Sequence, residues 1–139
     1  MSLSSEIKTA LLTNAPLAAI LTGSIHIDVE EISRQNTPTA FDATTKELKP
    51  CALIKTGVEP RMASGLADSV NTPLVIYFYE RQGYANIEPA MTLVFDQLSD
   101  QKIGTNVWQI HFDIAVNQQR DTALDCALGS LRFVAKRRR

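Results

Sequence analysis

The clearest hydrophobic pattern lies in the middle of the chain, where a change of period separates a strand from a helix. Residues 74–79 (LVIYFY) are apolar or aromatic in succession, which predicts a strand with both faces buried. After Gly83, apolar positions recur at intervals of three and four, the spacing of one helical stripe: Tyr84, Ile87, Met91, Val94 and Leu98. We therefore predict a buried strand, followed by a helix that begins near Asn86 and packs on the sheet.

Further strands are predicted on either side of this unit. Residues 25–29 alternate between apolar and polar, and residues 51–55 begin with an apolar run after Pro50. The cleanest alternation is at 107–116, where these apolar positions are predicted to share the core face: Trp108, Ile110, Phe112, Ile114 and Val116. The opposite face of that strand is expected to meet water or a partner.

The segment 122–135 fits two structures. Leu124, Leu128 and Leu131 have helical spacing, whereas Leu124, Cys126 and Leu128 alternate as in a strand paired with the Trp108 strand. Gly129 counts against the helix, and the polar link at 117–121 has the length of a hairpin connection. A strand over 124–134 is favoured, with the helix as the alternative.

Two short helices are predicted at the N-terminus. Ser4 or Ser5 can cap the first helix, and Pro16 suits the first turn of the second, which Gly23 would end. The buried stripe of the first helix is predicted to contain Ile7, Leu11 and Leu12. The sum of these elements is one α+β domain over residues 1–139, with a mostly antiparallel four- to five-stranded sheet packed with two or three helices.

Two polar excursions interrupt the pattern, at Glu30–Lys49 and Gly57–Asn71. Both exceed the ~4–6 residues of a typical connection. Long excursions of this kind often serve an interface, and a disordered loop is equally compatible with the sequence of the first. Phe41, Asp42 and Arg61 are the interface candidates within them.

Composition narrows the classes of function. The 139 residues are 45% hydrophobic and 21% charged, as in an ordinary globular protein. The net charge of −1 provides no overall electrostatic attraction to nucleic acid or to an anionic membrane. No apolar stretch approaches the ~20 residues of a membrane span, and no signal-peptide pattern is present. Cys51 and Cys126 lie in apolar runs, which favours buried, inert thiols in a reducing compartment over a disulfide or metal pair.

The residues offer little for catalysis. A cysteine could pair with His111, with Asp113 orienting the imidazole, but both cysteines belong to predicted core positions and the other two residues to a polar face. No phosphate-binding glycine loop and no acidic cluster with metal-ligand spacing occurs. We therefore predict no catalytic residue, cofactor or metal, and interpret Gln109, His111 and Asp113 as a solvated or subunit-facing strip.

The segment Lys136–Arg139 (KRRR) places four cations together. Such a cluster attracts the phosphates of passing DNA or an acidic protein surface. The alternative is a frayed, solvated terminus.

Three segments carry a resemblance to a known family: TPTAFD at 37–42, KPCALI at 49–54 and YFYERQGY…IEPA at 77–90. With the order of the predicted elements, they resemble the small neck and tail-completion (tail-terminator-like) proteins of long-tailed bacteriophages. The resemblance extends over about Leu3–Val134 and includes no catalytic signature.

The resemblance implies a ring-forming subunit, commonly a hexamer, that is assembled in the host cytoplasm and completes the tail tube in the neck of the virion. The implied partners are further copies of the chain, head-closure or adaptor proteins, the tail tube protein and passing DNA, without a membrane. A head-closure protein, a minor tail protein and a small Cys/His enzyme remain as alternatives. The resemblance transfers no functional residue position by position. The candidate interface residues come from the pattern of this chain and are Phe41, Asp42, Arg61, Gln109, His111, Asp113, Lys136, Arg137, Arg138 and Arg139.

Overall fold

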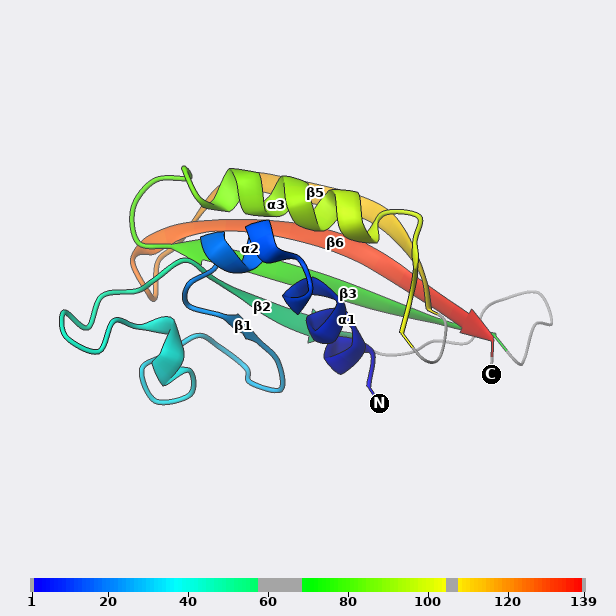
Figure 1. The fold of residues 1–139 in the computed structure, drawn as a ribbon, viewed down its shortest axis with the longest axis horizontal. Helices are drawn as coiled ribbons and strands as arrows, with labels where there is room; N and C mark the ends of the chain where they lie inside the picture. The colour runs from blue at the N-terminus through cyan, green and yellow to red at the C-terminus, as the bar shows by residue number, and fades with distance from the viewer. Residues whose placement is uncertain (1, 58–68, 105–107, 139) are drawn as a thin grey trace.

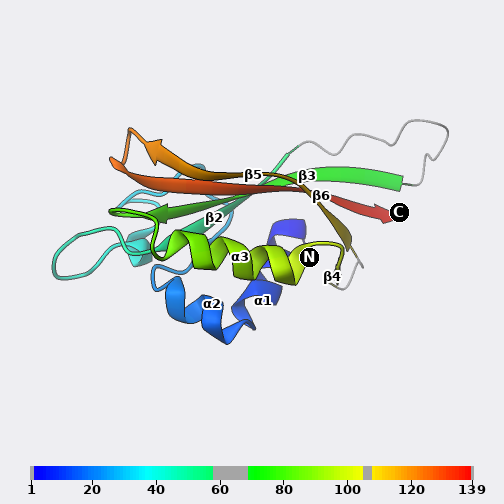
Figure 2. The ribbon, with the colours of Figure 1, turned by 90° about the horizontal axis from the view of Figure 1, so that it is seen from above.

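A computed structural model, which describes residues 2–57, 69–104 and 108–138, contains one six-stranded sheet with three α-helices on one face (Figures 1 and 2). The helices are α1 (Leu3–Leu12), α2 (Ala15–Ile20) and α3 (Ile87–Leu98), with a 3-10 helix η1 at Pro38–Ala40. The strands are β1 (Ile25–His26), β2 (Cys51–Thr56), β3 (Ser69–Glu80), β4 (Lys102–Ile103), β5 (Trp108–Asp121) and β6 (Cys126–Arg138). The predicted α+β class is confirmed, with one strand more than predicted.

The strand order is β1-β2-β3-β6-β5-β4, and only the β1–β2 pair is parallel. The segment with two possible structures is therefore a strand, and β6 lies between β3 and β5. The hairpin turn lies beyond the predicted link at 117–121, because β5 continues until Asp121 pairs with Cys126. In that turn, the backbone N–H of Leu124 donates to Asp121 Oδ1 at 2.9 Å.

The strand–helix unit that the sequence predicted forms the centre of the fold. β3 pairs with β2 and β6, so residues 74–79 are not at an edge, and α3 begins at Ile87. Glu80, the last residue of β3, is only 7% exposed, and its carboxylate accepts hydrogen bonds from backbone N–H groups at the start of α3. Its Oε1 accepts from the backbone N–H groups of Asn86 at 3.0 Å and Ile87 at 3.3 Å, and its Oε2 accepts from Asn86 Nδ2 at 2.7 Å. The end of the strand thus fixes the beginning of the helix.

Gly129 allows α3 to approach the middle of β6. A Cβ at this position would lie 2.7 Å from Met91 Sδ and 3.0 Å from Ile87 Cγ2, closer than side chains pack. The glycine inside the strand therefore marks a close contact between helix and sheet.

The N-terminal predictions need correction in detail. Ser2 caps α1, because its Oγ accepts from the backbone N–H of Ser5 at 3.2 Å, and Leu12 is 49% exposed rather than part of the buried stripe. Asn14 caps α2. The left-handed residue after α2 is Ser24 and not Gly23, and β1 has two residues because Asp28 adopts a positive φ of 61°.

The sheet separates two hydrophobic cores. The first lies between the sheet and α1–α3, and includes Ile7, Leu17, Leu74, Phe78, Val94, Trp108 and Phe133. The second core lies on the other face, at the end of the sheet near the β5–β6 turn, and consists of Ile32, Ala40, Cys51, Leu53, Tyr79 and Cys126. Among the described residues, no helix is long and apolar enough to cross a bilayer.

The excursion 30–49 forms the cover of the second core. Ile32 and Ala40 are buried, Phe41 forms a β-bridge with Leu48, and the backbone N–H of Lys49 donates to the carbonyl oxygen of Ala40 at 2.8 Å. The disordered alternative for this excursion is therefore wrong. The second excursion, 57–71, falls largely outside the described residues, and β3 already begins at Ser69.

Both cysteines are free and buried in the second core, as predicted. Burial is the main cause that raises the pKa of the Cys51 thiol to about 12 and that of Cys126 to about 11. Both thiols are therefore neutral near pH 7 and poor nucleophiles.

Candidate interaction surface

In the described part of the chain, all three α-helices lie on one side of the sheet, and the opposite side is here called the outer face (Figure 2). Strand register places side chains there in rows across β2, β3, β6 and β5. One row is Lys55, Val75, Arg132 and Ile114, and each of its members is exposed or half-buried. The next row toward the chain's C-terminus contains Pro73, Val134 and His111, all half-buried. Apolar and basic side chains therefore share a surface that the described helices leave uncovered.

A bulge in β5 determines which side chains reach this surface. Phe112 pairs with Phe133 and Ile114 pairs with Arg132, so Asp113 has no partner opposite to it on β6. The prediction that Ile114 and Val116 share the core face with Phe112 is wrong, because the extra residue reverses the alternation. Ile114 points outward and is 51% exposed, while Ala115 takes the position on the helix side.

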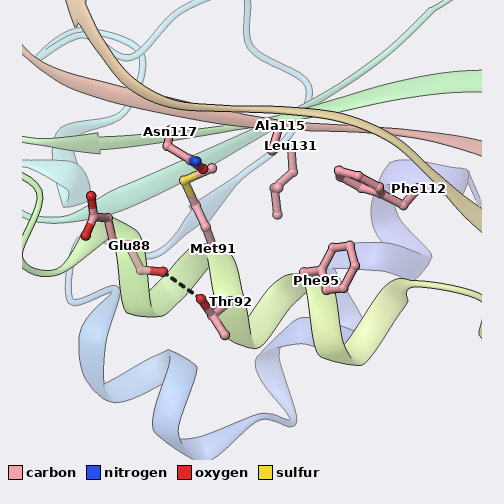
Figure 3. Close-up of a pocket in the computed structure, with 8 residues that line it drawn as sticks. All are labelled: Glu88, Met91, Thr92, Phe95, Phe112, Ala115, Asn117 and Leu131. Atoms are coloured by element: carbon pink, nitrogen blue, oxygen red, sulfur yellow. Dashed lines mark hydrogen bonds between the residues drawn. The ribbon is translucent and has the colours of Figure 1, made fainter.

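On the helix side, the same part of β5 borders a groove of about 480 Å³ against α3 (Figure 3). The rings of Phe95 and Phe112 pack edge to face with their centroids 4.9 Å apart, and both residues are more than one-third exposed. Gln118 Nε2 donates to Glu88 Oε1 at 3.0 Å at the border of the groove. The lining residues are Glu88, Met91, Thr92, Phe95, Phe112, Ala115, Asn117 and Leu131.

The predicted strip on β5 is only partly continuous. Gln109 and His111 lie on the outer face, but Asp113 is the exposed bulge residue. The acidic partner of His111 is Asp100, whose Oδ1 lies 3.5 Å from His111 Nδ1. This pair could not be predicted from the sequence pattern, because Asp100 belongs to the turn between α3 and β4.

The basic segment is part of the sheet. Lys136 pairs with Asn71 on β3 and Gln109 on β5, and the backbone pairing with β3 continues through Arg137 and Arg138. The frayed alternative is therefore wrong for the backbone of 136–138, whereas Arg139 lies outside the described residues. Gln109, His111 and Lys136 are brought together at this end of the outer face.

The candidates in the excursions lie elsewhere. Phe41 is half-buried beneath Arg34, whose guanidinium carbon is 5.6 Å from the ring centre. Asp42 accepts from the backbone N–H groups of Thr44 at 2.8 Å and Thr45 at 2.9 Å, and these bonds lower the pKa of its carboxyl group. Figure 1 shows the excursion and the end of β6 at opposite ends of the molecule. Arg61 lies outside the described residues.

The geometry does not assemble a nucleophile at His111. Cys126 pairs with Asp121, ten residues along β5 from His111, which corresponds to about 33 Å at ~3.3 Å per residue. Cys51 lies in the same second core as Cys126. Within 2–57, 69–104 and 108–138, no cluster of three metal-ligating side chains occurs.

Comparison with known proteins gives a fold relationship. No protein-family model and no curated protein matches the sequence. A similar solved structure is a chain of the virion of a native gene transfer agent (GTA) particle, with 17% sequence identity and a TM-score of 0.67. The match covers 99% of this chain and 96% of the other. The two chains share a fold.

Proposed function

We propose that this chain is a structural subunit of the neck of a phage-like particle, where it forms a ring that completes the tail tube and joins the tail to the head. The observation that carries the proposal is the fold shared with a virion chain over nearly the full length of both proteins. The sequence resemblance to tail-terminator-like proteins, over about Leu3–Val134, supports the same role.

The distribution of the candidate interface residues fits a subunit placed between two neighbours. Phe41 and Asp42 lie on the excursion at one end of the sheet, and Gln109, His111 and Lys136 lie at the other end (Figure 1). In a ring, one end would face the tail tube and the other a head-closure or adaptor protein. The basic end would also be the part of the subunit suited to an acidic neighbour or to passing DNA.

The first test is complementation in a particle system that lacks this subunit. With the wild-type chain, we expect joined heads and tails by electron microscopy. Without it, a tube-completing ring predicts unjoined heads and tails whose tubes do not end at the normal length. A head-closure role predicts unjoined heads with tails of normal length. Normal particles in the absence of the chain would contradict both roles.

A variant in the excursion 30–49 tests whether this segment is an assembly contact. Deletion of 40–47 is unsuitable, because Ala40 is buried in the second core and Phe41 bridges to Leu48. Replacing only the exposed tip 43–46 by Gly and Ser retains the buried Ala40 and the bridge between Phe41 and Leu48. We expect an unchanged unfolding transition and a loss of head–tail joining. Normal joining with this variant would show that the tip is not an assembly contact.

A further inference from the structure

The bulge at Asp113 creates a projecting side chain and a groove on opposite faces of the same strand. In an unbroken strand, Ile114 would follow Phe112 on the helix side and pack beside Phe95. The bulge instead turns Ile114 outward, where it is 51% exposed, and leaves the smaller Ala115 at the groove. One molecule therefore carries an exposed apolar projection and an exposed apolar hollow.

The charges around the two features are opposite in sign. On the outer face, Arg132 pairs directly with Ile114, and Lys55 lies in the same row. Beside the groove, Glu88 is a lining residue, and Asp96 is exposed on α3 next to Phe95. These four charged side chains form no ion pair with any residue of the described ranges. Asp113, next to Ile114, is acidic, and Glu30 and Glu31 border a hollow that Lys55 also lines, so the positive charge beside Ile114 comes mainly from Arg132.

We propose that neighbouring copies of this chain bind through these unlike surfaces, with Ile114 of one copy in the α3–β5 groove of the next. Arg132 and Lys55 then approach Glu88 and Asp96 of the neighbour. The inference rests on the proposed function, because it specifies how the ring is built.

The position of the two features determines the symmetry of the contact. Ile114 and the groove lie on opposite faces of the sheet, so one two-fold contact cannot use both in each partner. Each copy must use its groove for one neighbour and its Ile114 for another, which is a head-to-tail contact. Such contacts close into a ring when the rotation between copies divides a full turn. The opposite charges of Arg132 and Lys55 on one copy and Glu88 and Asp96 on the next favour this pairing over others. They also make the association weaker as the salt concentration rises.

The decisive test uses two substitutions that block one surface each. Ile114→Glu places an acid against the acidic groove border, and Phe95→Glu fills the groove of its own copy with charge. Leu12→Glu is the matched control, since Leu12 is a similarly exposed aliphatic residue on α1. Circular dichroism and the unfolding midpoint establish that all variants are folded.

Sedimentation velocity and native mass spectrometry of the full chain then give the expected pattern. The wild type and Leu12→Glu assemble, and Ile114→Glu and Phe95→Glu are each monomeric. An equimolar mixture of the two blocked variants yields heterodimers and nothing larger. The reason is that Ile114 of the Phe95→Glu copy still fits the intact groove of the Ile114→Glu copy.

Cysteine cross-linking extends the test to weak association. Ile114→Cys mixed with Phe95→Cys should form disulfide-linked dimers on oxidation, and the double variant should form a ladder of larger species. Ile114→Cys mixed with Leu12→Cys should form none. The native thiols are buried and do not compete.

Two results would overturn the inference and leave the ring proposal intact: rings formed by both Glu variants, or efficient cross-linking of Ile114→Cys with itself. A wild-type monomer whose cysteine variants fail to cross-link at any concentration also overturns it. Whether the chain completes a tail is then decided by the complementation experiment alone.

Discussion

The two faces of the sheet differ in how completely the described residues cover them. On β3, Leu74, Ile76 and Phe78 face the helices and are fully buried, whereas Val75 and Tyr77, on the same strand, are half-buried on the outer face. The excursion closes the outer face only where the second core lies. The helix side should therefore determine the stability of the subunit, and the open part of the outer face should determine what the subunit binds.

The largest difference between the two faces is expected when two neighbouring residues of β3, one on each face of the sheet, are truncated. Phe78→Ala should lower the free energy of unfolding by ~3–5 kcal/mol, because it empties a fully buried aromatic site. Tyr77→Ala, on the outer face, should cost clearly less. Chemical denaturation of both variants gives the two values. Equal losses would show that the outer face is as important to the monomer as the helix side.

A smaller effect is expected where the helix layer is attached to the sheet. Glu80→Ala leaves the backbone N–H groups of Asn86 and Ile87 without their acceptor and should cost ~1–3 kcal/mol. Glu80→Gln retains an acceptor oxygen and should cost less. Denaturation curves and amide exchange at the start of α3 measure the loss. Unchanged exchange there would contradict the capping role.

On the open surface, substitutions should barely change stability. Ile114→Thr removes an exposed side chain from a β-strand with a β-branched replacement, so the free energy of unfolding should stay within ~0.5 kcal/mol of the wild type. Thermal unfolding under conditions where the protein is monomeric provides the measurement. A loss above ~1 kcal/mol would place Ile114 among the residues that hold the subunit together.

The smallest expected effect concerns the second core. Because burial raises the pKa of Cys51 to about 12 and of Cys126 to about 11, iodoacetamide at pH 8 should modify neither thiol in the native state. Mass spectrometry after denaturation should show both alkylated. Modification of the native protein would indicate that the excursion opens and that this part of the outer face is less closed than the helix side.

The sequence predicted elements whose pattern is local and missed features that depend on distant partners. The change of period around Gly83 is complete within residues 74–98, and it correctly predicted β3 and α3. The bulge at Asp113 has no local signature, because the alternation continues through it and only the alignment of β5 with β6 shows the extra residue. The same holds for Lys136–Arg138, a basic segment that is a strand because it pairs along its length with β3.

The candidate surface was predictable in part. The alternation of β5 correctly predicts that Gln109 and His111 lie on the face away from the core. It wrongly predicts that Ile114 faces the core, because the bulge at Asp113 leaves no trace in the alternation. Arg132 could have been found, because Leu131, Phe133 and Ala135 alternate with more polar neighbours once the segment is taken as a strand. The fold of the excursion depends on single apolar residues, such as Ile32, whose partners are distant in the sequence.

The central place of β6 has a consequence for the order in which the protein can fold. When residues 1–125 have been synthesised, β3 and β5 both lack the strand that separates them in the finished sheet. Until β6 arrives, β3 presents an unpaired edge that can join another chain, which is a known route to aggregation. Of the two pairings that β6 makes, only the one with β5 closes locally, and the β3–β6 pairing must bridge a long loop, which makes folding slow. The nascent subunit is therefore most vulnerable late in its synthesis, and a chaperone that shields β3 at that stage should raise the yield of folded protein more than one that acts on the N-terminal helices.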